Sequence, residues 1–120
     1  MDADYPQKWV IFACRSTAQF DVYRNPDPIS RKTIPYLLDI QAELLADLAT
    51  RVVVPLIVSG SFAKPARILN PVFSIEDHGV VMSTQELAGV SRSELGDRVA
   101  NLASERDTII AALDLLISGI

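Results

Sequence analysis

The sequence contains one cysteine, Cys14, and one histidine, His78, among its 120 residues. A lone cysteine excludes an intramolecular disulfide and a cysteine-ligated zinc site, and it is typical of proteins in a reducing compartment, so we expect a cytoplasmic location. The single histidine lies in Glu76-Asp77-His78-Gly79, a pattern typical of a solvent-exposed turn. We therefore expect no bound metal ion and no catalytic histidine.

The sequence also lacks the motifs of common enzyme classes. It has no P-loop, no dinucleotide-binding fingerprint and no HExxH helix, and its five glycines are dispersed. Ser59-Gly60-Ser61 is interpreted as a turn and not as a nucleophile elbow, because no helix pattern follows it directly. Carboxylates such as Asp97 and Glu105 lie near predicted turns or a helix start, where solvation and the helix dipole explain them. The residues alone predict no enzyme, no catalytic residue and no cofactor.

Long apolar runs and clustered positive charge are absent as well. No run approaches the roughly 18 apolar residues that a membrane helix needs, and Asp2 and Asp4 replace the basic start of a signal peptide. The formal net charge is −4, and the 11 lysines and arginines are scattered, whereas a nucleic-acid surface concentrates such residues. We expect no membrane partner and no sequence-specific nucleic-acid binding. The hydrophobic content of 49% fits one folded domain.

The hydrophobic pattern predicts strands followed by one helix. The β-branched run at Arg51–Val54 is expected to end at Pro55, or Pro55 marks a sheet edge and the strand resumes at residues 56–58. Ser104 is the expected N-cap of a final helix, whose apolar residues recur at three- and four-residue spacing as far as Ile117. Other strands are expected at residues 20–23, 36–41, 72–75 and 80–83, with Asp77-His78-Gly79 as the turn between the last two. This order predicts a small barrel or curled sheet that is closed by a helix.

Two segments are ambiguous from the residues alone. Glu43–Ala49 is rich in helix formers although it lies between predicted strands. Trp9–Cys14 forms a short edge strand or covers an exposed apolar patch. The last residues of the sequence, Leu115–Ile120, are apolar apart from Ser118 and Gly119, so they either pack onto the domain or are offered to a partner.

Several segments, taken in order, resemble the CcdB toxin family. The resemblance covers about residues 18 to 120. It implies an N-terminal extension at residues 1–18 and a toxin domain at residues 19–120, and it implies that residues 43–49 form a loop projecting between strands. The implied fold is mainly β (α+β), an SH3-like barrel of about five to seven antiparallel strands closed by a C-terminal helix, assembled as a homodimer. The segments that resemble the family's successive strands are Gln19–Tyr23, Leu38–Gln41 and Arg51–Leu56. The stretch Val99–Ala103 and the final Gly119-Ile120 resemble the family's C-terminal helix and terminus.

The resemblance also implies a function. Members of this family are toxins of toxin–antitoxin modules that bind the A subunit of DNA gyrase and trap the gyrase–DNA cleavage complex. A partly disordered antitoxin neutralises them, and they act by binding. The family ends in a gyrase-contacting Trp-Gly-Ile; Gly119 and Ile120 match this motif, whereas Ser118 replaces the tryptophan. The other gyrase-binding positions implied by the resemblance are Leu44, Leu45, Asp114 and Ile117.

The replacement at Ser118 predicts weakened poisoning, because a serine cannot stack on an arginine or bury a large apolar area as a tryptophan does. Two other functions remain as alternatives. One is an mRNA endoribonuclease on the same barrel, which needs a basic groove and an arginine that stabilises the transition state, with Arg51 and Arg67 as the candidates. The other is a non-toxic relative that still binds an antitoxin.

Overall fold

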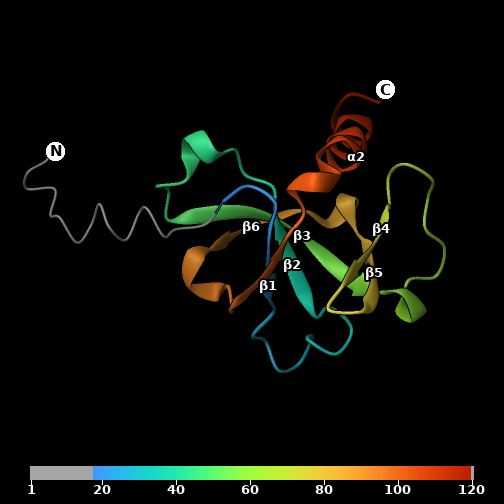
Figure 1. Ribbon diagram of the computed structural model, residues 1–120, viewed down its shortest axis with the longest axis horizontal. Coiled ribbons are helices and arrows are strands. Elements are labelled where there is room, and N and C mark those ends of the chain that lie inside the picture. The colour runs from blue at the N-terminus through green and yellow to red at the C-terminus, as the bar shows by residue number, and fades with distance from the viewer. Residues whose placement is uncertain (1–17, 120) are drawn as a thin grey trace, which may run out of the picture.

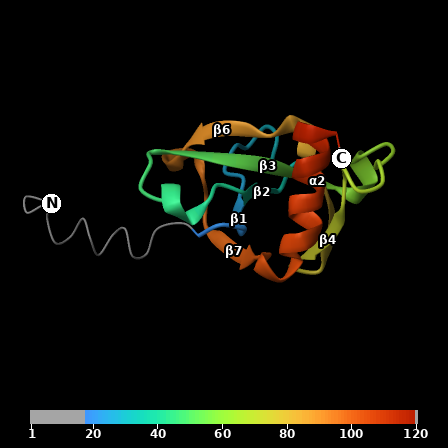
Figure 2. The same ribbon diagram turned by 90° about the horizontal axis from the view of Figure 1, so that it is seen from above.

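The computed structural model describes residues 18–119, which fold into one curled antiparallel sheet with a helix packed across it (Figures 1 and 2). Six of the seven strands follow the spatial order β4-β5-β3-β2-β1-β7, and the seventh strand, β6, pairs with β3. This half-barrel with a C-terminal helix confirms the predicted fold class. The prediction for Trp9–Cys14 lies outside the described residues, as does Ile120. The elements are β1 (Asp21–Arg24), β2 (Tyr36–Asp39), β3 (Thr50–Val58), β4 (Val72–Ile75), β5 (His78–Met82), β6 (Ala88–Ser91), β7 (Arg98–Asn101) and α2 (Arg106–Ser118).

The strand β3 runs straight through Pro55, so the expectation that this proline ends the strand or marks a sheet edge is wrong. β3 pairs with β6 through Thr50–Val53 and with β5 through Leu56–Val58, which leaves Pro55 between the two partners. The Pro55 carbonyl accepts a hydrogen bond from the Ser83 amide on that side, at 3.0 Å. The N–H and C=O groups of one strand residue face the same neighbour. The missing proline N–H therefore faces the gap between β5 and β6, where no donor is needed.

The hairpin between β4 and β5 turns one residue earlier than the predicted Asp77-His78-Gly79. Glu76 and Asp77 have φ angles of 51° and 67°, and Ile75 pairs with His78. Two central residues with positive φ form the primed turn that matches strand twist in a two-residue hairpin loop. His78 therefore belongs to β5, where it is exposed, and it is not part of the turn.

The helix α2 begins at Arg106, so the prediction of Ser104 as its N-cap is wrong. The likening of Val99–Ala103 to the C-terminal helix is also wrong, because Arg98–Asn101 forms the strand β7, which pairs with β1. Ser104 lies inside a short 3-10 turn, Ala103–Glu105, that precedes the helix, and no side chain caps α2. The amide of Ala103 is instead satisfied by the Asn101 side-chain oxygen at 2.8 Å. No helix within residues 18–119 combines the length and the hydrophobicity needed to cross a membrane.

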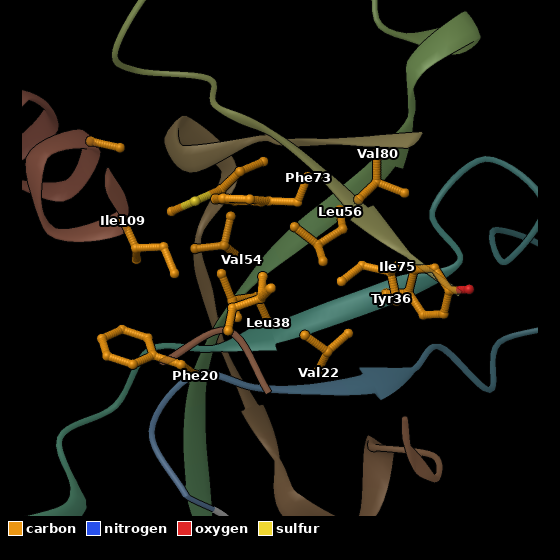
Figure 3. Packing of buried hydrophobic residues seen from close by; sticks show 13 residues of the cluster. Phe20, Val22, Tyr36, Leu38, Val54, Leu56, Phe73, Ile75, Val80 and Ile109 are labelled. Carbon is orange, nitrogen blue, oxygen red and sulfur yellow. The ribbon is translucent and has the colours of Figure 1, made fainter. Parts of the chain in front are cut away.

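The hydrophobic core lies between the concave side of the sheet and α2 (Figure 3). Ile109 points from the helix toward Val54 and Phe20, and Ile109 and Ala112 are fully buried. The core cluster consists of Phe20, Val22, Tyr36, Leu38, Val54, Leu56, Phe73, Ile75, Val80, Met82, Leu102, Ile109 and Ala112.

We expect Ile109→Ala to lower the free energy of unfolding by about 2–5 kcal/mol, because it removes a fully buried side chain and leaves a cavity. The matched control is Ile117→Ala on the same helix, where the side chain is 75% exposed and the expected change is within about 0.5 kcal/mol. Urea unfolding of both variants measures the difference. Equal losses would show that α2 does not pack as described.

Candidate functional site

The last turn of α2 presents its side chains to solvent. Asp114, Ile117, Ser118 and Gly119 are all exposed, and the end of the helix stands away from the sheet (Figure 1). Gly119 has φ 74° and ψ 21°, and its amide donates to the Leu115 carbonyl at 3.0 Å. This left-handed residue closes the helix in the manner for which glycine is suited. The predicted positions at the C-terminal end are therefore displayed on a capped helix, and Ile120 lies outside the described residues.

A second apolar surface lies on the segment between β2 and β3. We call residues 42–49 the leucine loop. Its helix-forming residues make a single 3-10 turn, Glu43–Leu45, in which the Leu45 amide donates to the Ala42 carbonyl. Leu44, Leu45 and Leu48 are 93%, 46% and 48% exposed. Exposed leucines grouped in this way are typical of a surface that contacts a partner.

The structure does not bring the two surfaces together in one chain. In both Figures 1 and 2 the leucine loop lies beside the start of β3, and α2 lies toward the other end of this strand. The leucine loop is thus separated from the end of α2, and the six implied positions that the structure describes form two surfaces.

A buried ion pair lies beneath the leucine loop. Asp39 and Arg51 both have fully buried side chains, and Arg51 Nε donates to Asp39 Oδ2 at 2.9 Å, with Nη2 2.8 Å from the same oxygen. The backbone amide of Gln41 donates to the other carboxylate oxygen at 2.9 Å. Burial raises the pKa of Asp39, against the lowering effects of the Gln41 amide and the Arg51 charge. The pair therefore joins β2 to β3 as part of the barrel interior.

This burial overturns one sequence interpretation. Arg51 was a candidate for stabilising a transition state, but its guanidinium is 0% exposed and is occupied by Asp39. Arg67 is exposed on the segment before β4, away from the start of β3 that carries Arg51 (Figure 1). Of the two candidates for a catalytic arginine, only Arg67 therefore has an exposed side chain. Within residues 18–119, no group of three or more His, Cys, Asp and Glu side chains could hold a metal ion.

Sequence reasoning missed the side chains that hold the leucine loop. Gln41 Nε2 donates to the Leu45 carbonyl at 2.8 Å, and Arg92 Nη2 donates to the Leu48 carbonyl at 3.0 Å. Arg92 lies in a 3-10 turn after β6, Arg92–Glu94. No spacing signal links Arg92 to a loop so far away in the sequence, and only the pairing of β6 with β3 brings them together.

The sequence itself assigns the family. The family model described as CcdB protein matches residues 19–119. The chain belongs to the CcdB family. The resemblance to this family is thereby confirmed over residues 19–119, and the match covers the sheet together with α2.

Two solved structures share the fold of this CcdB-family chain. An endoribonuclease from Mycobacterial species has a TM-score of 0.65 and 17% identity, over 86% of this chain and 92% of that chain. An endoribonuclease in complex with its cognate antitoxin, also from Mycobacterial species, has a TM-score of 0.66 and 17% identity, over 85% of this chain and 95% of that one. These likenesses establish the shared fold.

The comparison corrects the expectation that the CcdB-family chain is not an enzyme. That expectation came from the absence of catalytic motifs, yet two proteins with the same barrel are named endoribonucleases. Missing motifs therefore do not exclude ribonuclease chemistry on this fold, because function depends on the site and not on the fold.

Proposed function

We propose that this protein is the toxin of a toxin–antitoxin module and that it binds the A subunit of DNA gyrase, trapping the gyrase–DNA cleavage complex. The observation that carries the proposal is the capped and exposed last turn of α2, with Ile117 75% exposed and Gly119 in the left-handed conformation. Membership of the CcdB family supports the choice of target. We place the protein in the cytoplasm, as a homodimer.

The side chains at the end of α2 are suited to weak binding of the gyrase A subunit. Ile117 offers an apolar anchor, and Ser118 supplies no aromatic surface. Asp114 adds a negative charge one turn earlier, which suits a basic partner that handles DNA and speeds the encounter more than it tightens the complex. We propose that Ile117, Ser118, Gly119 and Ile120 make the main contact and that Asp114 orients it.

The leucine loop supplies a second contact in this proposal. Because Leu44 and Leu45 lie away from the α2 end in one chain, they would contact a separate part of the target. We also propose a partly disordered antitoxin as a partner. The structure of an endoribonuclease of the same fold in complex with its cognate antitoxin supports that partner class.

Cleavage of RNA is the second candidate function, and the two endoribonucleases with this fold favour it. Arg51 is unavailable because it is buried against Asp39, so Arg67 is the remaining candidate for the catalytic arginine. In this alternative Arg67 would stabilise the charge that develops on the scissile phosphate.

One experiment separates these functions. The wild type and a variant that lacks Gly119 and Ile120 are induced in cells, and the purified proteins are added to gyrase with plasmid DNA and, separately, to a long RNA without gyrase. We expect growth arrest and accumulation of cleaved plasmid for the wild type and loss of both for the truncated variant. RNA cleavage without gyrase would replace the first function by the second. Tight antitoxin binding with no growth arrest would indicate a non-toxic relative.

A further inference from the structure

The leucine loop is held from its inner side by side chains that lie outside it. Gln41 Nε2 and Arg51 Nη1 donate to the Leu45 carbonyl at 2.8 and 3.4 Å. Gln41 is itself fixed, because its Oε1 accepts a hydrogen bond from the Val52 amide at 3.0 Å, and Arg51 is fixed by Asp39. The first half of the loop is thus tied to the start of β3.

A single arginine holds the second half. Arg92 Nη2 donates to the carbonyls of both Ala46 and Leu48, the latter at 3.0 Å, and the Arg92 amide donates to the Ala49 carbonyl at 2.9 Å. The turn that carries Arg92 is set by the pairing of Thr50 with Ser91, where β6 meets β3. The guanidinium of Arg92 therefore ties two carbonyls of the loop to the sheet, and its backbone amide ties a third.

The position of Arg92 carries an energetic cost. Its Nε is buried and has no hydrogen-bond partner among the described residues, and a buried unsatisfied donor disfavours folding. The hydrogen bonds of the Arg92 side chain are therefore incomplete in its position. The terminal nitrogen makes the useful contacts, and these all go to the loop.

We propose that Arg92 is a positioning residue for target binding. By fixing the carbonyls of Ala46 and Leu48, it keeps Leu44 and its neighbours displayed in one conformation without touching the target. A loop that is ordered before binding loses less conformational entropy when the complex forms, and this raises the affinity. The inference rests on the proposed function, because it takes the leucine loop as a gyrase contact.

The first test needs no partner. Amide hydrogen exchange over residues 42–49 is compared in the wild type, in Arg92→Gln and in Arg92→Lys. Arg31→Gln is the control, because Arg31 is exposed on the connection between β1 and β2. We expect about tenfold faster exchange in Arg92→Gln, the size expected for losing a charge-assisted hydrogen bond, and a smaller rise in Arg92→Lys. The control should leave the rate unchanged. Unchanged exchange in Arg92→Gln would overturn the proposal.

The second test is a double-mutant cycle on binding to the gyrase A subunit. We expect Leu44→Ala and Arg92→Gln each to weaken binding about tenfold, and the double variant to be little weaker than either single variant, because both act through the same side chain. A merely stabilising role for Arg92 would make the two losses multiply to about a hundredfold. That result would overturn the inference and leave the proposed function standing.

Failure of the proposed function gives a different result. If the wild type does not bind gyrase, the gyrase contact is wrong, and the exchange measurement still decides whether Arg92 holds the loop. If truncation of α2 abolishes gyrase binding while Leu44→Ala and Arg92→Gln leave it unchanged, gyrase binding stands. In that case the loop is no contact, and the positioning role of Arg92 is overturned.

Discussion

Arg51→Met is expected to lower the free energy of unfolding by about 3–5 kcal/mol, because it leaves a buried carboxylate without its partner. Asp39 and Arg51 are both fully buried, and Arg51 supplies the only cation in contact with Asp39 among the ion pairs of residues 18–119. Methionine fills similar space but brings no charge. Denaturation in urea measures the loss, and a change below about 1 kcal/mol would contradict a structural role for the pair.

The double variant Asp39→Leu/Arg51→Met is the control for this prediction. It removes both charges together, so it should lose less stability than Arg51→Met alone, because no uncompensated charge remains inside the barrel. The single variant Asp39→Leu is measured as well. If the double variant loses as much free energy of unfolding as Arg51→Met and Asp39→Leu lose together, packing and not charge accounts for the effect.

The loss in free energy of unfolding caused by Arg51→Met should also depend on pH. Burial raises the pKa of Asp39 even with Arg51 present, and removing Arg51 raises that pKa further. A carboxyl group whose pKa is higher in the folded state binds more protons there, so stability falls as the pH rises from the unfolded value toward the folded value. The difference in unfolding free energy between the wild type and Arg51→Met should therefore shrink as the pH falls from neutral toward about 4, the unfolded value, and it should be smallest below that pH.

Ser118→Trp is expected to strengthen gyrase binding by about thirtyfold, which corresponds to the roughly 2 kcal/mol of an aromatic hot spot. Ser118 is the last residue of α2 and is exposed, so a larger side chain at this position meets no steric obstacle within the barrel. The indole ring would add apolar area and a face for stacking on an arginine of the target. Titration of the purified gyrase A subunit measures the change.

One control variant and one cellular measurement accompany this prediction. Ser118→Ala removes the hydroxyl without adding an aromatic ring, and it should not raise the affinity. In cells, Ser118→Trp should arrest growth at lower induction than the wild type. Equal affinity of the tryptophan and alanine variants would show that the end of α2 does not face gyrase.

Much of the fold was predictable because local patterns determine it. The alternation around Val22 and Leu38 marks strands whose inward side chains are buried, and the apolar spacing marks the terminal helix. The predictions that were wrong concern residues whose structure depends on strands far away in the sequence. Pro55 sits within β3 only because β5 and β6 leave a gap beside it, and β6 and β7 lack a strong strand pattern of their own.

In the candidate site, too, features set by local sequence were predictable, and features set by distant contacts were not. The apolar character of Leu44 and Ile117 is visible in the sequence, and both side chains are exposed. The interpretation of Arg51 as a catalytic candidate was wrong because its partner Asp39 comes from another strand, and no local pattern reveals that pairing. Arg92 could not be predicted for the same reason, since its contacts with the loop are made across the sheet.

The central claim is that the end of α2 binds the gyrase A subunit, and isothermal titration with the full chain tests it most directly. The account predicts measurable binding by the wild type and none by a variant that lacks Gly119 and Ile120. The unfolding midpoint of both proteins is measured alongside, because Gly119 also donates the hydrogen bond that closes α2. Equal binding by both proteins, or no binding by the wild type, would contradict the account.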